Sequence, residues 1–201
     1  MKTMKNNVLV TGMPRSGTSV TMRILQALGY TRLGNKHVRH CDPQFNPDGY
    51  EELNEEDYIP AMQSLIDGKG YCVKVFGVFI NMVAPSSVDK VIMCTRDMEQ
   101  AVLSTQEMFR GTAKLEWYGK KYTFTGTRKE AESTIINNMF GAEKWLKFHK
   151  KGYHVSKLEY LKANPGQAIE ELVKYLGEGN NIQSAIALVR GQKCQDIAIN
   201  G

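Results

Sequence analysis

The sequence has few cysteines, and none of them stands near another. Cys41, Cys72, Cys94 and Cys194 are the four, and no two of them form a Cys-x-x-Cys pair. Disulfide frameworks and structural zinc sites in chains of this kind use grouped cysteines, so we expect reduced thiols and no bound metal. This cysteine usage favours a cytoplasmic protein.

Long hydrophobic runs and dense charge are also lacking. The basic N-terminus, Met1 to Asn7, leads into an apolar run too short for a signal peptide or a membrane span. The net charge of +5 is mild and spread along the chain, which suits a small anionic ligand better than nucleic acid. No repeat, low-complexity run or linker divides the sequence, so we expect residues 1–201 to form a single domain with no nucleic-acid or membrane partner.

The most informative stretch lies near the N-terminus. A β-branched run ends at Gly12, a loop of small and basic residues follows, and apolar residues then recur at helical spacing from Val20 to Leu28. Gly29 ends the periodic pattern. This order predicts a strand, a tight loop and a helix. Such a turn directs backbone N–H groups and the positive end of a helix dipole at one point, where a phosphate or sulfate binds well.

The loop also carries polar groups that a merely connecting turn would not need, although a turn that binds nothing is the structural alternative. Its spacing from Gly12 to Gly17 fits the start of a Walker A loop, but Thr18 stands where that motif has lysine, and the basic residue is Arg15. Two glycines permit close backbone approach to an anion, while Arg15 and the neighbouring hydroxyls offer donors.

The segment Pro14 to Ser19 resembles the loop Pro-Lys/Arg-Ser-Gly-Thr-Ser/Thr of sulfotransferases that use 3′-phosphoadenosine 5′-phosphosulfate (PAPS), and it matches at every position. The resemblance implies that this loop binds the 5′-phosphosulfate of the donor. The residues concerned are Pro14, Arg15, Ser16, Gly17, Thr18 and Ser19.

A second signature follows the predicted strand Asp89 to Cys94, which leads into a helix reaching about Phe109. Arg96 and Ser104 lie eight residues apart, so both can reach one side of that helix. The sulfotransferase family has an arginine and a serine at this spacing, and the resemblance implies that the pair holds the 3′-phosphate. A weaker match places Arg190 near the family's Arg-Lys-Gly turn on the same phosphate.

The acceptor side departs from the best-known relatives. The predicted strand 71–76 carries Lys74, but Phe76 stands where animal cytosolic sulfotransferases have the histidine base. The segment 46–52 resembles the Asn-Pro-x-Gly-Tyr/Phe-x-Glu stretch of bacterial and phage relatives, which makes Glu52 the candidate base; its acidic neighbourhood also fits a plain helix N-terminus. His40 is the main rival for this role, and Glu51 and His37 lie in the same long loop, expected over residues 30–56.

The expected fold is α/β, a P-loop-containing three-layer α/β/α arrangement with a central parallel sheet. Strands expected at 8–11, 71–76, 90–95 and 153–158 alternate with helices, one of them opened by a capping box at Thr127 and Glu130. A segment at 158–161 resembles the family's Tyr-Glu-Asp-Leu motif. Residues 111–126 are interpreted either as a lid or acceptor wall or as a hairpin with solvated lysines.

The predicted function is transfer of a sulfuryl group from PAPS to a hydroxyl or amine of a small-molecule or carbohydrate acceptor. Arg15, Glu52 and Lys74 are the candidate catalytic residues, and no metal is required because arginine and lysine supply the positive charge. Two alternatives stay open. One is a P-loop kinase, which lacks support because no Gly-Lys-Ser/Thr or Walker B strand is present, and the other is a non-catalytic nucleotide-binding relative.

Overall fold

A computed structural model describes residues 5–34, 53, 55–111, 114–117, 120–123 and 125–191. The strands are β1 Val8–Gly12, β2 Thr31–Leu33, β3 Tyr71–Lys74, β4 Lys90–Thr95, β5 Lys114–Trp117, β6 Lys120–Thr123 and β7 His154–Lys157. The α-helices are α1 Thr18–Ala27, α2 Glu55–Asp67, α3 Met98–Gly111, α4 Arg128–Phe148, α5 Leu158–Ala163, α6 Pro165–Leu176 and α7 Ile182–Arg190. Two 3₁₀ helices, η2 Gly77–Met82 and η3 Pro85–Ser87, lie between β3 and β4.

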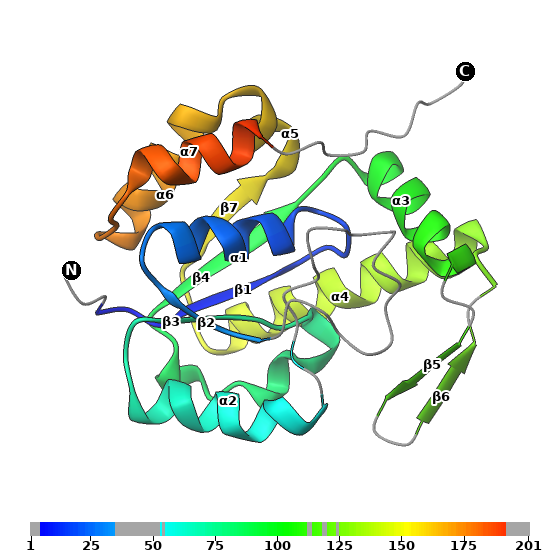
Figure 1. Cartoon of the computed structure of the whole chain (residues 1–201). Coiled ribbons are helices and arrows are strands. Elements are labelled where there is room, and N and C mark those ends of the chain that lie inside the picture. Colours follow the sequence, from blue (N-terminus) through cyan, green and yellow to red (C-terminus); the bar gives the residue numbers. More distant parts are fainter. Residues whose placement is uncertain are drawn as a thin grey trace.

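Five strands form one parallel sheet in the order β2-β3-β1-β4-β7 (Figure 1). The first strand in sequence is the central one, with Val10 opposite Lys74 of β3 on one side and opposite Ile92 of β4 on the other. Because all five strands point the same way, the loops that follow β1, β3 and β4 emerge at one edge of the sheet. The expected α/β fold with a central parallel sheet is confirmed.

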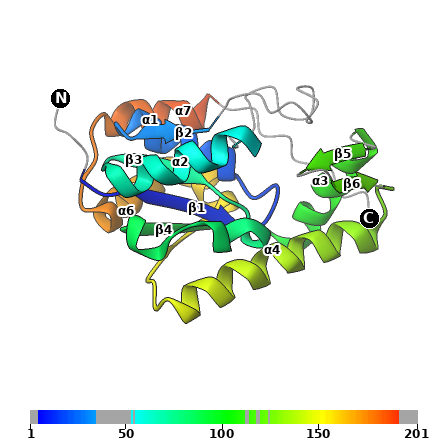
Figure 2. The same cartoon turned by 90° about the horizontal axis from the view of Figure 1, so that it is seen from below.

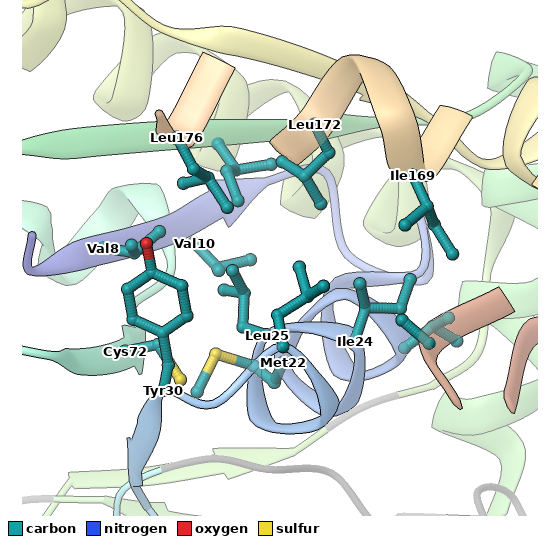
Figure 3. Packing of buried hydrophobic residues seen from close by; sticks show 14 of the residues in the cluster. Val8, Val10, Met22, Ile24, Leu25, Tyr30, Cys72, Ile169, Leu172 and Leu176 are labelled. Carbon is teal, nitrogen blue, oxygen red and sulfur yellow. The ribbon is translucent and has the colours of Figure 1, made fainter. Parts of the chain in front are cut away.

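Helices cover both faces of the sheet, which gives the three expected layers (Figures 1 and 2). Along β1, Val8 and Val10 pack with residues of α1, α6 and α7, while Leu9 packs on the opposite face with residues of α2, η2 and α4. This alternation follows the period of two in a strand, and its wholly apolar burial is typical of parallel strands. Figure 3 shows the first cluster, in which Met22 and Leu25 of α1 and Leu172 of α6 pack with the residues of β1.

One polar side chain at the start of β1 holds together the loops at the opposite edge of the sheet. The two N–H donors of Asn7 Nδ2 are shared among the carbonyl oxygens of Leu65, Gly68 and Ser87, which lie at 2.8, 2.9 and 3.0 Å. Its Oδ1 accepts the backbone N–H of Tyr71 at 3.1 Å. Fully buried polar groups need such partners, so Asn7 fixes α2, η3 and β3 around β1.

The structure differs from the sequence-based expectation most clearly at β2 and at the end of β3. The stretch expected to be loop from residue 30 contains the short edge strand β2, and β3 ends at Lys74 rather than at residue 76. Phe76 instead precedes η2. This segment crosses α4 at a point where each of the two helices has a glycine, Gly77 in η2 and Gly141 in α4. A Cβ atom on Gly77 would overlap the carbonyl oxygen of Asn138, so this crossing requires the absence of a side chain.

Residues 114–123 contain the antiparallel pair β5 and β6, with Lys114 opposite Thr123. The antiparallel hairpin is therefore confirmed, and both its solvated lysines and a role as a lid stay predictions. The hairpin extends from the end of α3, away from the central sheet (Figure 1). The capping box is confirmed in part: the Thr127 side chain accepts the N–H of Glu130, whose carboxylate accepts the N–H groups of Thr125 and Gly126.

Candidate active site

The loop after β1 has the tight geometry that an anion-binding turn requires. Gly12 has φ 127° and its position leaves no room for a Cβ beside the carbonyl of Cys94, which accepts the N–H of Met13 at 3.1 Å. Gly17 has φ 85° and is the N-cap of α1. Both glycines adopt backbone conformations that other residues rarely take, so the sequence pattern directly sets this turn. The N-terminus of α1 consequently faces the loop.

Arg15 lies at the middle of the loop in the left-handed conformation, with φ 61°. Its Nε donates to the hydroxyl of Ser104 on α3 at 3.0 Å. Its carbonyl oxygen accepts a hydrogen bond from Nη1 of Arg96 at 3.1 Å. A non-glycine residue in this conformation needs support from its surroundings, and these two contacts provide it. The structure thus brings the loop together with the arginine and serine of the second signature.

Arg96 follows β4 and is nearly buried, with 6% of its side chain exposed. Its Nη2 donates to Oε1 of Gln100 at 3.4 Å, one turn further along α3. Asp97 caps that helix, because its Oδ1 accepts the N–H of Gln100 at 3.0 Å. Ser104 is also buried, two turns along the same helix. A buried guanidinium beside a helix N-terminus forms a strongly positive point at this edge of the sheet.

Lys74 ends β3 on the other side of the loop. Its Nζ donates to the hydroxyl of Ser19 at 3.2 Å and lies 5.3 Å from the centre of the Phe76 ring. Only 3% of Lys74 is exposed, although a lysine is rarely buried. Its contact with an aromatic face is favourable to a cation. Lys74 therefore directs a second buried positive charge at the loop.

The remaining predicted loop residues support the turn. The Ser16 hydroxyl donates to the carbonyl of Met13 at 2.6 Å, Pro14 is buried within the turn, and Thr18 is the first residue of α1. Beneath the loop, the Thr21 hydroxyl lies 3.4 Å from the sulfur of Cys94. Burial raises the pKa of the Cys94 thiol to about 12, so this group is neutral at physiological pH.

Four of the predicted residues, Glu52, Glu51, His37 and His40, lie outside the described residues, so their roles stay predictions. Arg190 is the exposed last residue of α7, a helix that packs against α1.

Sequence reasoning missed Glu159, the second residue of α5. Its Oε1 accepts the backbone N–H of Asp97 at 3.0 Å and lies 3.9 Å from Nε of Arg96. The signal was present in the resemblance of residues 158–161 to the Tyr-Glu-Asp-Leu segment, but that segment gave no reason to place the carboxylate beside Arg96. Gln100 was missed too, and a helical spacing of four from Arg96 could have indicated it.

The chain belongs to the sulfotransferase domain family, whose profile matches residues 5–195. No curated protein matches the sequence. Among solved structures, it is similar to the sulfotransferase domain of the olefin synthase from Synechococcus PCC 7002, with 13% identity and a TM-score of 0.53 over 95% of this chain and 80% of the other.

Two further sulfotransferase structures are similar over 94% of this chain. One is STF9 from Mycobacterium avium, with 11% identity, a TM-score of 0.56 and 68% of its length covered. The other is mouse SULT7A1 complexed with PAP, with 13% identity, a TM-score of 0.57 and 65% of its length covered. At these identities the likeness shows the fold. The chain spans between about two thirds and four fifths of the length of these three relatives.

Within the described part of the chain, no group of three or more His, Cys, Asp or Glu side chains is placed to hold a metal ion. In the same described part, no helix is long and apolar enough to cross a bilayer.

Proposed function

We propose that this chain transfers the sulfuryl group of PAPS to a hydroxyl or amine of a small-molecule or carbohydrate acceptor and releases adenosine 3′,5′-bisphosphate. The observation that carries the proposal is the contact of Arg15 with both Ser104 and Arg96. It joins the loop suited to a 5′-phosphate to the pair suited to a 3′-phosphate. The proposal includes residues 1–201 acting as a single cytoplasmic domain, in keeping with the buried thiols of Cys72 and Cys94.

Donor binding would use the N-terminus of α1 and the side chains around it. The backbone N–H groups of residues 15–19 would hold the 5′-phosphate, and Arg96 with Ser104 would hold the 3′-phosphate. Arg190 is kept as a further candidate for the 3′-phosphate. Mouse SULT7A1, which shares this fold, was crystallised as a complex with PAP, and this supports a donor of the same class here.

Sulfuryl transfer, like phosphoryl transfer, requires the protein to position the two substrates and to stabilise the charge that develops between them. The acceptor oxygen or nitrogen would form a bond to sulfur while the bond from sulfur to the bridging oxygen breaks. Arg15 and Lys74 would stabilise the negative charge that develops on the transferred group and on the leaving phosphate. The acceptor proton would pass to Glu52.

The non-catalytic alternative has one observation in its favour. Phe76 lies beside Lys74, at the position where animal cytosolic relatives have their histidine base. A chain that kept the nucleotide site but lacked any base would bind the bisphosphate without turnover. The kinase alternative has no comparable support.

The test combines binding and turnover. Adenosine 3′,5′-bisphosphate should raise the melting temperature of the protein, whereas ATP with Mg²⁺ should not. A library of hydroxyl and amine acceptors with radiolabelled PAPS should then give a labelled product. Stabilisation by the bisphosphate without any labelled product would favour the non-catalytic alternative, and stabilisation by ATP with Mg²⁺ alone would favour a kinase.

A further inference from the structure

Glu159 lies where the edge strand of the sheet meets the candidate donor site. β7 pairs with β4 in parallel, with Lys157 opposite Thr95, so the residues that follow the two strands are neighbours. Arg96 and Asp97 follow β4, and Leu158 and Glu159 follow β7. The register of this pair therefore places the Glu159 carboxylate beside the Arg96 guanidinium.

The contacts of Glu159 are those of a side chain that fixes another in place. Its Oε1 accepts the N–H of Asp97 at 3.0 Å and lies 3.9 Å from Nε of Arg96. Its Oε2 is shielded from solvent and has no hydrogen-bond partner among the described residues. A carboxylate has capacity for two parallel hydrogen bonds to a guanidinium, so this second oxygen is well suited to the same arginine.

With Glu159 included, the Arg96 guanidinium is contacted on three sides. Nη1 donates to the carbonyl of Arg15, Nη2 donates to Gln100, and Nε faces Glu159. A planar guanidinium held in this way has one orientation rather than several rotamers, and less entropy is lost when it binds an anion.

The neighbouring residue reaches the other half of the site. A Cβ on Gly17 would lie 2.8 Å from Cδ1 of Leu158, so Leu158 packs directly on the phosphate loop. Two consecutive residues at the start of α5 thus touch the 5′ loop and the arginine after β4. This gives a physical reason for the segment at 158–161 that the proposed mechanism did not use.

We propose that Glu159 is a positioning residue for recognition of the donor's 3′-phosphate, acting through Arg96 and the N–H of Asp97. The inference rests on the proposed function, because it takes Arg96 as a 3′-phosphate ligand. The proposed role predicts the opposite of a purely electrostatic effect of Glu159 on anion binding. A carboxylate near an anion repels it, so if Glu159 acted through its charge alone, removing it would tighten binding of the bisphosphate.

The experiment compares two ligands that differ only in the 3′-phosphate. Calorimetry would measure the affinities of adenosine 3′,5′-bisphosphate and adenosine 5′-monophosphate for the wild type, Glu159→Ala, Glu159→Gln and the control Glu170→Ala, which removes an exposed carboxylate from α6. We expect Glu159→Ala to weaken the bisphosphate about 10-fold and to leave the monophosphate unchanged. Glu159→Gln should fall between, because an amide oxygen still accepts the N–H of Asp97, and the control should match the wild type.

A double variant separates positioning from a general loss of structure. In an Arg96→Ala background, Glu159→Ala should change bisphosphate affinity less than about 2-fold, because the residue through which it acts is gone. If Glu159→Ala does not fold, Glu159→Gln carries the same comparison.

The outcomes distinguish the two levels of the proposal. Equal or tighter bisphosphate binding in Glu159→Ala, or equal losses for both ligands, would overturn the positioning role while the donor site stands. A wild-type protein that binds both ligands equally would overturn the 3′-phosphate site itself and this inference with it.

Discussion

Nε of Arg15 donates a hydrogen bond to the hydroxyl of Ser104 at 3.0 Å, across 89 positions of sequence. One of these residues belongs to the loop after β1 and the other to α3. The contact joins the loop before α1 to α3. A substitution at either residue should therefore change the affinity for a ligand that contacts both segments.

Arg15→Ala and Arg96→Ala should each weaken binding of adenosine 3′,5′-bisphosphate by ~1.5–3 kcal/mol, since each removes a charge-assisted hydrogen-bond donor. Isothermal titration calorimetry on folded variants measures this directly. Lys144→Ala, which removes an exposed positive charge from α4, is the control for loss of net charge. Unchanged affinity in both arginine variants would show that the donor binds elsewhere.

Glu52→Gln should lower turnover roughly 10²-fold or more once an acceptor is known, with donor binding retained, because general-base catalysis contributes on this scale. Steady-state rates with radiolabelled PAPS, paired with bisphosphate titrations, separate the two effects. His40→Ala is the comparison, because a histidine pKa of about 6.5 suits proton transfer near neutrality. A normal rate in Glu52→Gln together with an inactive His40→Ala that still binds donor would assign the base to His40.

Gly77→Ala should destabilise the fold by about 1–3 kcal/mol, because its Cβ would overlap the carbonyl of Asn138 and push η2 away from α4. Urea denaturation at constant pH measures the change in unfolding free energy. The matched control is Gly166→Ala in α6, where an added Cβ meets nothing within 4 Å. Equal stability of the two variants would mean that η2 and α4 do not cross this closely.

The hydrogen bonds of the Asp89 carboxylate should make the free energy of unfolding decrease at acidic pH. Burial alone would raise its pKa, but hydrogen bonds from Lys69 Nζ at 2.7 Å and from the N–H of Asn7 at 2.8 Å outweigh burial and lower it. A carboxyl with a lowered folded pKa stabilises the fold above its unfolded pKa of about 3.9, and this stabilisation is lost as the pH falls through the folded pKa.

Asp89→Asn should therefore be less stable than the wild type at pH 7, and the difference between them should shrink as the pH falls below about 4. Urea denaturation across this pH range is the measurement, with Glu170→Gln as an exposed control. A difference that stays constant with pH would show that the Asp89 carboxyl has the same pKa in the folded and unfolded chains.

Cys72 and Cys94 should resist alkylation in the native protein. Both thiols are buried, and burial raises the pKa of Cys94 to about 12, which removes the reactive thiolate. Peptide mapping after iodoacetamide treatment should find these two cysteines modified only when the protein is denatured first. Rapid native labelling of Cys94 would contradict the burial of the strand that carries it.

The sequence predicted the parts of the fold that depend on local signals. The strand-loop-helix unit, the Thr127 cap and the α4 helix follow from residue type and spacing, and the structure has them where expected, although Glu130 accepts from Thr125 and Gly126 rather than from Thr127 itself. The edge strand β2 was missed because three residues with an exposed Thr31 give no period-two pattern. The early end of β3 was missed because it depends on the contact of Gly77 with a helix about 60 residues away, which no local signal encodes.

The candidate site shows the same division. The loop residues and the pair Arg96 and Ser104 were found because they form motifs with fixed spacing. Glu159 was not found as a site residue, because its place beside Arg96 depends on β7 lying next to β4, and strand order is a tertiary property. Lys74 was found as a site residue, but its place as the last residue of β3 was not, because the strand was expected to run to residue 76.

The central position of β1 also bears on how the chain folds during synthesis. Among the strands of the sheet it is synthesised before the others, yet its two neighbours, β3 and β4, end at residues 74 and 95. Its hydrogen-bonding edges stay unmatched until both have been made, so sheet formation depends on contacts distant in sequence, which slows folding and exposes apolar strands to aggregation. Fragments that end before β4 should consequently refold poorly and bind chaperones tightly.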